Sequence, residues 1–149
     1  MSYAEAQDES HRNPAPPFMD AALFDRTFDE GMSLVEETAR YLDGPGREES
    51  RVLPRGAALL YAGESMRVTT RLMQAASWLL IQRAVREGEM CPEAAAGERY
   101  RLGSKEICFG GRVENIDLLP RTLRDLLDRS ERLHEACAAA VPSAYPASF

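Results

Sequence analysis

Apolar residues recur at alternating intervals of three and four along three long stretches of this chain, as in helices with one buried face. The first such helix is predicted to run from Asp20, a good N-cap, to about Leu42, before the turn-forming sequence DGPG at residues 43–46. Its predicted core stripe consists of Phe24, Phe28, Gly31, Val35, Thr38 and Leu42. A stripe of this kind needs other helices to pack against.

The second predicted helix is the longest. It opens near Pro54 and continues to about Glu87, with Gly88 as its C-terminal stop, and at 1.5 Å per residue it is about 50 Å long. One stripe at intervals of three and four is predicted to face the core. Its members are Tyr61, Ser65, Val68, Leu72, Ala76, Leu79 and Arg83.

The third predicted helix runs from Leu118 or Leu119 to about Ala140, with Pro120 in its first turn. Its core stripe is heptad-like and comprises Leu119, Leu123, Leu126, Ser130, Leu133 and Cys137. Residues 89–117 interrupt the pattern. They contain a short helical turn that opens at Pro92 and ends near Leu102, and then a connection without periodicity, whose length indicates mobility or a binding role.

These elements predict an all-α fold in which three long helices form an antiparallel bundle, with a long connection between the second and third. The middle helix lies antiparallel to its neighbours if the connections are direct. A chain of 149 residues is about one domain in size. We expect a flexible N-terminal arm at residues 1–19, a helical domain at 20–140 and a short flexible tail at 141–149.

The middle helix has a second notable side. Residues 72–82 carry no charge, and a helical wheel places Trp78 nearly opposite the core stripe. An exposed Trp beside Arg, Gln and aliphatic groups is typical of a binding hot spot. Self-association and binding of a different protein both fit this face, and so does a Trp78 that covers an edge of the bundle beneath residues 89–117. The predicted binding row is Arg71, Gln74, Trp78, Ile81, Gln82 and Val85.

Charge is unevenly distributed along the chain. The formal net charge of -6 argues against a nucleic-acid partner, which would require a clustered positive field. Residues 20–50 contain nine acidic residues and three arginines, whereas residues 51–90 contain six arginines and three acidic residues. This asymmetry favours an isologous dimer or an acidic partner. A second predicted docking surface is the acidic side of the first helix, with Asp29, Glu30, Glu36 and Glu37.

The expected compartment is a reducing cytoplasm. Three cysteines at wide, irregular spacing indicate neither a disulfide framework nor a metal knuckle. The N-terminus does not have the basic start and apolar stretch of a signal peptide, and the uncharged run at 72–82 is far shorter than the roughly 18 to 20 residues of a membrane span. We therefore expect a protein that does not enter the membrane.

The candidate catalytic groups are few. Cys137 and His134 are three residues apart, but Cys137 belongs to the core stripe, where thiols are inert. A zinc site built from these two residues with Cys91 and Cys108 would have the right ligand types but not the usual close spacing. Arg83 is a candidate anion ligand, but an internal salt bridge with an acid such as Asp125 or Asp128 is the favoured interpretation. The sequence predicts neither an enzyme nor a cofactor.

Two segments carry a family resemblance. FDRTFDEGMSLVEETARYLDGPG (24–46) and SMRVTTRLMQAASWLLIQRAVREGEM (65–90) resemble the alphaproteobacterial family typified by the regulator of CtrA degradation, and the resemblance covers roughly residues 20–140. It implies a dimeric three-helix protein that acts as an adaptor for the ClpXP protease. It also implies a cytoplasmic protein that is recruited to a cell pole.

The resemblance implies partners as well. These are ClpX or other proteolysis adaptors, a response-regulator-like protein and a cyclic-di-GMP-binding protein, to which an adaptor helps bring cell-cycle regulators. The family's extended C-terminal tail contributes to partner contacts. Here the tail is short, and Tyr145 and Phe149 are its candidate anchors. A dimeric interaction scaffold without a role in proteolysis would have the same helices and the same Trp78 face.

Overall fold

The computed structural model describes residues 20–95, 97 and 114–140, and these residues form helices and turns without a β-strand. Three long helices dominate: α2 (Ala21–Asp43), α4 (Arg55–Arg86) and α7 (Arg121–Ala140). Shorter helices are α3 (Pro45–Arg51), α5 (Pro92–Ala95) and the 3-10 helix η3 (Ile116–Leu118). The all-α fold class is confirmed for this part of the chain. The predicted arm at 1–19 and tail at 141–149, which includes Tyr145 and Phe149, lie outside the described residues.

The helix ends follow local sequence signals. The Asp20 carboxylate caps α2 by accepting a hydrogen bond from the backbone N–H of Leu23 at 2.7 Å. Gly88 ends α4 with a φ of +77°, a conformation that favours glycine. Helix α3 was not predicted, because its short polar sequence has the composition of a loop. It is held against α2 by the Tyr41 hydroxyl, which donates to the Glu49 carboxylate at 2.6 Å.

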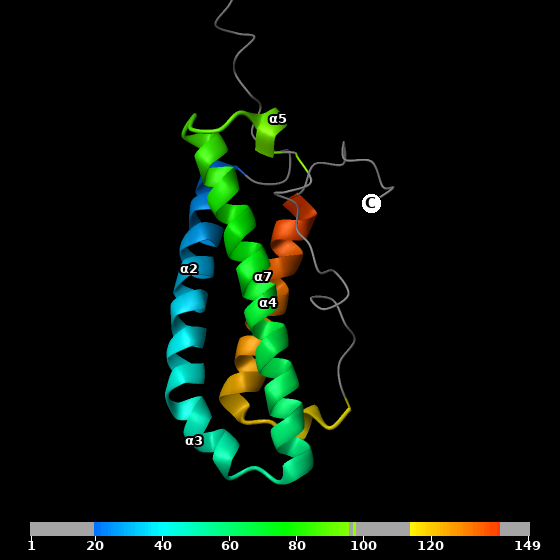
Figure 1. Ribbon diagram of the computed structural model, residues 1–149. Coiled ribbons are helices and arrows are strands. Elements are labelled where there is room, and N and C mark those ends of the chain that lie inside the picture. Colours follow the sequence, from blue (N-terminus) through cyan, green and yellow to red (C-terminus); the bar gives the residue numbers. More distant parts are fainter. Residues whose placement is uncertain (1–19, 96, 98–113, 141–149) are drawn as a thin grey trace, which may run out of the picture.

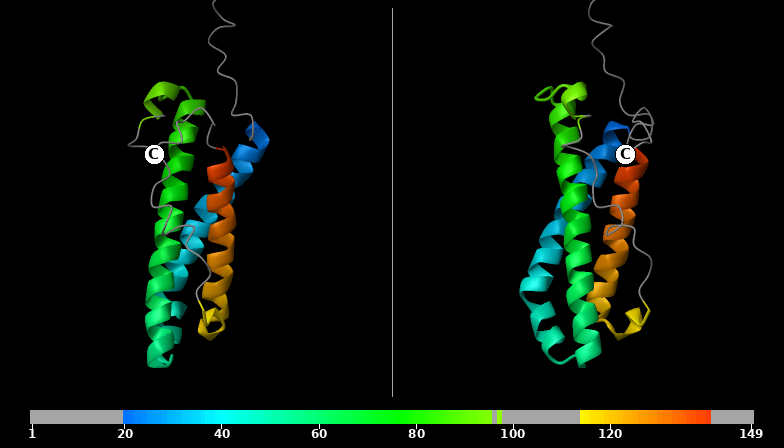
Figure 2. Two further views of the ribbon diagram at one scale, coloured as in Figure 1. Left: turned by 90° about the vertical axis from the view of Figure 1, so that its right-hand side faces the viewer. Right: turned by 45° about the vertical axis from the view of Figure 1, so that its right-hand side comes forward.

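Helices α4 and α7 run in the same direction, and α2 runs opposite to both (Figure 1). Leu60, near the start of α4, and Leu118, just before α7, line one pocket, and this places the two helix starts at the same end. The predicted antiparallel order is therefore correct for α2 and α4 and wrong for α4 and α7. Helix α5 lies at the end where α4 finishes, whereas η3, which leads into α7, lies at the end where α4 begins (Figure 2).

The core lies between the three long helices. The six residues of the predicted α7 stripe, from Leu119 to Cys137, are all buried. Prediction was less accurate for α4. Arg83 is exposed, bonds to Glu87 at 3.1 Å and lies over the ring of Phe28 at 4.7 Å, so the expected internal pair with Asp125 or Asp128 is wrong.

Candidate functional site

The predicted binding row of α4 does not form an exposed face. Trp78 is only 5% exposed and belongs to the core cluster, and Arg71 is 3% exposed. The remaining four, Gln74, Ile81, Gln82 and Val85, are partly buried. The expectation of an exposed Trp78 with Arg71 beside it is therefore wrong. The helical wheel places Trp78 on the outer side of α4, but its large aromatic side chain is stabilised more by packing inside the protomer.

Arg71 is buried because α7 supplies its hydrogen-bond acceptors. The guanidinium donates to the backbone carbonyl of Leu127 at 2.9 Å and to the hydroxyl of Ser130 at 3.0 Å. A buried charge is tolerated in a protein interior only when such partners satisfy it. Arg71 thus ties α4 to α7, and its role in this protomer is structural.

A different side of α4 faces solvent, and it carries no charge. Between positions 56 and 82, every residue of α4 classed as exposed is uncharged, although the chain as a whole is 28% charged. We call these residues the α4 outer face. They are Gly56, Leu59, Ala62, Gly63, Met66, Thr69, Met73, Ser77 and Leu80.

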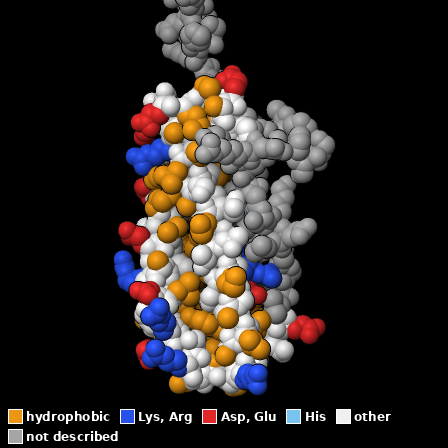
Figure 3. All heavy atoms as spheres, viewed as in Figure 1, with side chains coloured by type: hydrophobic (Ala, Val, Ile, Leu, Met, Phe, Trp, Pro, Cys, Tyr) orange, Lys and Arg blue, Asp and Glu red, His pale blue; other side chains and the backbone are white. Residues whose placement is uncertain are grey.

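The large members of the α4 outer face recur every seven residues. Leu59, Met66, Met73 and Leu80 are 70%, 72%, 64% and 52% exposed, respectively. Hydrophobic side chains follow the length of this side of the molecule, while many of the charged ones lie toward its edge (Figure 3). A continuous apolar surface of this kind is uncommon on a monomer and marks an interaction site.

A groove between α2 and α4 extends this surface. Its volume is about 270 Å³, and all ten residues that line it are uncharged. Val35, Ala39 and Leu42 line it from α2, and Met73 and Leu80 line it from α4. The Met73 and Leu80 side chains therefore belong to both the α4 outer face and the groove. This arrangement can bind apolar side chains of another protein without leaving a buried charge unpaired.

Among the catalytic candidates in the described residues, Cys137 is not placed as a reactive thiol. Cys137 is fully buried, and burial raises the pKa of its thiol to about 12, so the thiolate nucleophile is absent near neutral pH. Burial and the nearby Arg71 lower the pKa of His134. Cys91 is exposed, whereas Cys108 lies outside the described residues. Within the described ranges, no cluster of three His, Cys, Asp or Glu side chains is placed to hold a metal ion.

The described helices also lack a membrane segment. None of them is long and apolar enough to cross a bilayer. The uncharged stretch of α4 is instead divided between the interior, where Leu72, Ala75 and Leu79 pack, and the outer face. One helix thus has two apolar sides.

Sequence comparisons and structural comparison agree on the family. A family model described as "Protein of unknown function (DUF1465)" matches residues 15–139. A solved structure, "Crystal Structure of RcdA from Caulobacter crescentus CB15", matches with 60% sequence identity and a TM-score of 0.68, over 83% of this chain and 92% of that chain. The chain belongs to the RcdA family. A comparison with curated proteins gave no match.

Membership of the RcdA family confirms the resemblance predicted from residues 24–46 and 65–90. The two segments include much of α2 and α4, which line the apolar groove between them. What sequence reasoning missed in this RcdA-family protein is the side of α4 that faces outward. The signal was present in the spacing of Leu59, Met66, Met73 and Leu80.

Proposed function

We propose that this RcdA-family protein is a non-enzymatic adaptor. It binds partner proteins and helps deliver cell-cycle regulatory proteins to the ClpXP protease. The observation that carries the proposal is the uncharged, apolar α4 outer face, because an adaptor needs binding surfaces and no catalytic groups. The match to RcdA supports the connection with regulated proteolysis.

The α4 outer face joins two copies of this chain in a homodimer. Its large residues occur in the order Leu, Met, Met, Leu at positions 59, 66, 73 and 80, and this order reads the same from either end. A two-fold axis near Thr69 therefore places Leu59 against Leu80 of the partner subunit, and Met66 against Met73 of the partner subunit. An isologous interface requires such self-complementarity.

The spacing also suits a helix pair. A seven-residue apolar repeat winds two helices around one another with a left-handed twist. The exposed positions between the large residues hold small side chains, including Gly63 and Ser77, which let two helix backbones approach closely. The two copies run antiparallel, because only that arrangement pairs the two ends of the repeat.

Partners bind elsewhere on the dimer. The expected partners are ClpX or other proteolysis adaptors, and response-regulator-like proteins. This protein meets them in the cytoplasm and at a cell pole. Asp29, Glu30, Glu36 and Glu37 are all exposed on α2, and this supports the acidic side of α2 as a docking surface. Glu37 also forms an ion pair with Arg129 of α7 at 2.7 Å.

The decisive experiment compares three proteins in a capture from lysate of the source bacterium, with mass spectrometry of the retained proteins. They are the wild type, a Met66→Glu/Met73→Glu variant, and a control in which the exposed α7 residues Thr122 and Ala139 become Glu. We expect the wild type and the control to retain ClpX or a response-regulator-like protein. A purified regulator found among the retained proteins should then be degraded faster by ClpXP when the wild type is added.

A dimeric scaffold without a role in proteolysis is the alternative, and the self-complementary α4 outer face favours it equally. It predicts that captured proteins are unrelated to ClpXP and that degradation rates do not change on addition of the protein. Either result, obtained with an intact dimer, would contradict the adaptor proposal.

A further inference from the structure

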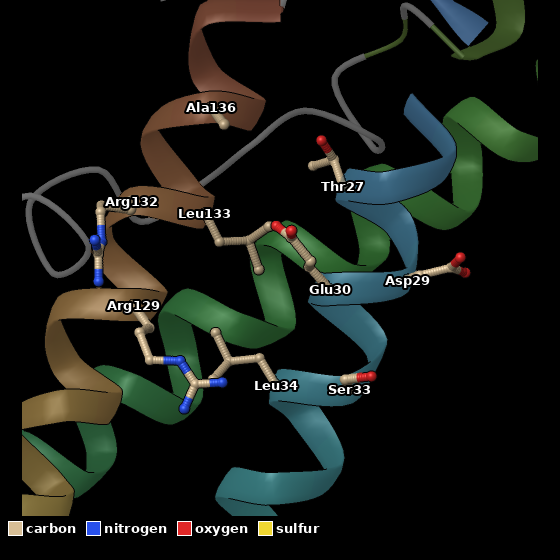
Figure 4. A pocket seen from close by; sticks show the side chains of 9 residues that line it. All are labelled: Thr27, Asp29, Glu30, Ser33, Leu34, Arg129, Arg132, Leu133 and Ala136. Carbon is tan, nitrogen blue, oxygen red and sulfur yellow. The ribbon is translucent and has the colours of Figure 1, made fainter. Parts of the chain in front are cut away.

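A second groove lies between α2 and α7, on a side of the molecule that the α4 outer face does not include. Its volume is about 630 Å³. It is lined over residues 27–34 of α2 and 129–136 of α7, about two helical turns on each side. Figure 4 shows that its lining side chains come from these two helices, with α4 behind them.

The groove has an apolar floor and small side chains on its rim. Leu34 and Leu133 form the floor and are buried. Ser33 on α2 and Ala136 on α7 line the rim and are exposed. Small rim residues beside an apolar floor allow the ridge of another helix to enter between two helices.

A charge network centred on Arg129 lies at one end of the groove. The Arg129 guanidinium donates to both carboxylate oxygens of Glu37, at 2.9 and 2.7 Å, and to the Asp125 carboxylate at 3.2 Å. The charges of Arg129, Glu37 and Asp125 neutralise one another. Other side chains therefore determine what the neighbouring part of the groove can bind. The pair also fixes the separation of α2 and α7 at this point.

Two further charges line the groove on opposite walls. Glu30 of α2 points across it toward Leu133, whereas Asp29 points away (Figure 4). Arg132 lines the α7 wall. Neither Glu30 nor Arg132 forms an ion pair with another residue in the described ranges. A ligand that pairs with both must carry a cation on one edge and an anion on the other.

We propose that this groove binds one amphipathic helix of a partner protein, with an apolar stripe on the floor, a Lys or Arg against Glu30, and an Asp or Glu against Arg132. The added helix completes a four-helix arrangement with α2, α4 and α7. The inference rests on the proposed binding function but uses a different surface from the α4 outer face. The opposed charges disfavour helices whose two edges have the same sign.

The test uses three synthetic helical peptides with the same apolar stripe and different edges: Lys on one and Glu on the other, Lys on both, or Glu on both. Binding is followed by fluorescence anisotropy. We expect the mixed-edge peptide to bind wild type about tenfold more tightly than either uniform peptide. The Lys-edged peptide also controls for nonspecific attraction to an acidic protein, whose net charge is -6.

Charge reversal should change the preferred peptide. Glu30→Lys makes both walls basic, so the Glu-edged peptide should bind best. Arg132→Glu makes both walls acidic, so the Lys-edged peptide should bind best. Asp25→Lys is the matched control, because Asp25 is exposed on α2 and does not line the groove. Ser33→Trp should weaken all three peptides by filling the groove.

Three results would overturn the inference: no binding by any peptide, the same ranking in Glu30→Lys as in Asp25→Lys, or undiminished binding to Ser33→Trp. Sedimentation of the same samples measures dimerisation separately. An intact dimer with no peptide binding would reject the α2–α7 groove alone. Loss of the dimer in Met66→Glu/Met73→Glu, with unchanged peptide binding, would show that the two surfaces act independently.

Discussion

The guanidinium of Arg71 on α4 donates a hydrogen bond of 3.0 Å to the hydroxyl of Ser130 on α7, 59 positions along the chain. The same guanidinium also donates to the backbone carbonyl of Leu127, which accepts a second hydrogen bond from the Ser130 hydroxyl. Arg71 was predicted to be part of a surface binding row, but it instead supplies the principal polar contact described between α4 and α7. Its replacement should act on folding and not directly on partner binding.

We predict that Arg71→Ala lowers the free energy of unfolding by about 2 to 4 kcal/mol, because it removes charge-assisted hydrogen bonds and leaves a cavity. Urea denaturation measures the change. Arg55→Ala is the control, since Arg55 is exposed at the start of α4, and it should change stability by less than about 0.5 kcal/mol. Equal effects of the two substitutions would contradict the structural role of Arg71.

The antiparallel dimer can be tested by disulfide formation. In a protein with Cys91 and Cys108 replaced by Ser, we predict that Leu59→Cys/Leu80→Cys cross-links two copies, whereas Leu59→Cys alone does not. Twenty-one residues of helix separate positions 59 and 80, about 30 Å, and a disulfide requires Cα atoms within about 7 Å. Non-reducing electrophoresis detects the product. Efficient cross-linking of Leu59→Cys alone would indicate parallel helices.

Replacement of Gly46 and of Gly56 by alanine should have opposite effects on stability. A Cβ at Gly46 would lie 2.8 Å from the Tyr41 carbonyl oxygen, so Gly46→Ala should destabilise the protein by about 1 to 3 kcal/mol. Nothing lies within 4 Å of a Cβ at Gly56, in the first turn of α4, so Gly56→Ala should stabilise it by up to about 1 kcal/mol. Thermal unfolding of both variants measures the difference. A rise in melting temperature for Gly46→Ala would show that α3 is not packed as described.

Stability should fall as the pH drops below 6.5 because of His134. Burial, and then Arg71, lowers the pKa of His134 in the folded protein from the ordinary value of 6.5. The unfolded state therefore binds more protons than the folded state in the window below pH 6.5. The stabilisation is fully present above pH 6.5 and decreases toward the lower folded pKa. Urea unfolding at a series of pH values should show this slope in wild type and not in His134→Leu.

Cysteine labelling should separate the buried thiol from the exposed one. Cys91 is exposed and should react with iodoacetamide at pH 8 in the native protein. Cys137 is fully buried with a pKa of about 12, so it should react only after urea is added. Peptide mass mapping assigns the modified sites. Rapid native labelling of Cys137 would mean that α7 opens readily.

The helices were predictable because their apolar periodicity is a local property. The α7 stripe from Leu119 to Cys137 needed no more than the spacing of its residues, and its burial is confirmed. The Asp20 cap and the Gly88 stop were equally local. The direction of α7 was not predictable in this way, since a long connection can return a chain to either end of a bundle.

The orientation of α4 depended on information that a single helix does not contain. Both of its sides are apolar, so a helical wheel cannot say which one faces the other helices. Trp78 was assigned to the outside because the helical wheel places it nearly opposite the predicted core stripe, but in the structure it packs within the protomer. The acceptors that bury Arg71 come from α7 and are invisible to any reading of α4 alone.

The direction of the chain also has a mechanical consequence. The start of α2 and the end of α7 lie at the same end of the long helices, because α2 leaves that end and α7 returns to it (Figure 1). Tension applied between these two points would pull α2 and α7 apart from that end, loading their contacts one after another. Such peeling resists force far less than shear, in which all contacts break together. A molecular machine that pulls on the chain at either end of this domain would therefore meet little mechanical resistance for a domain of this size.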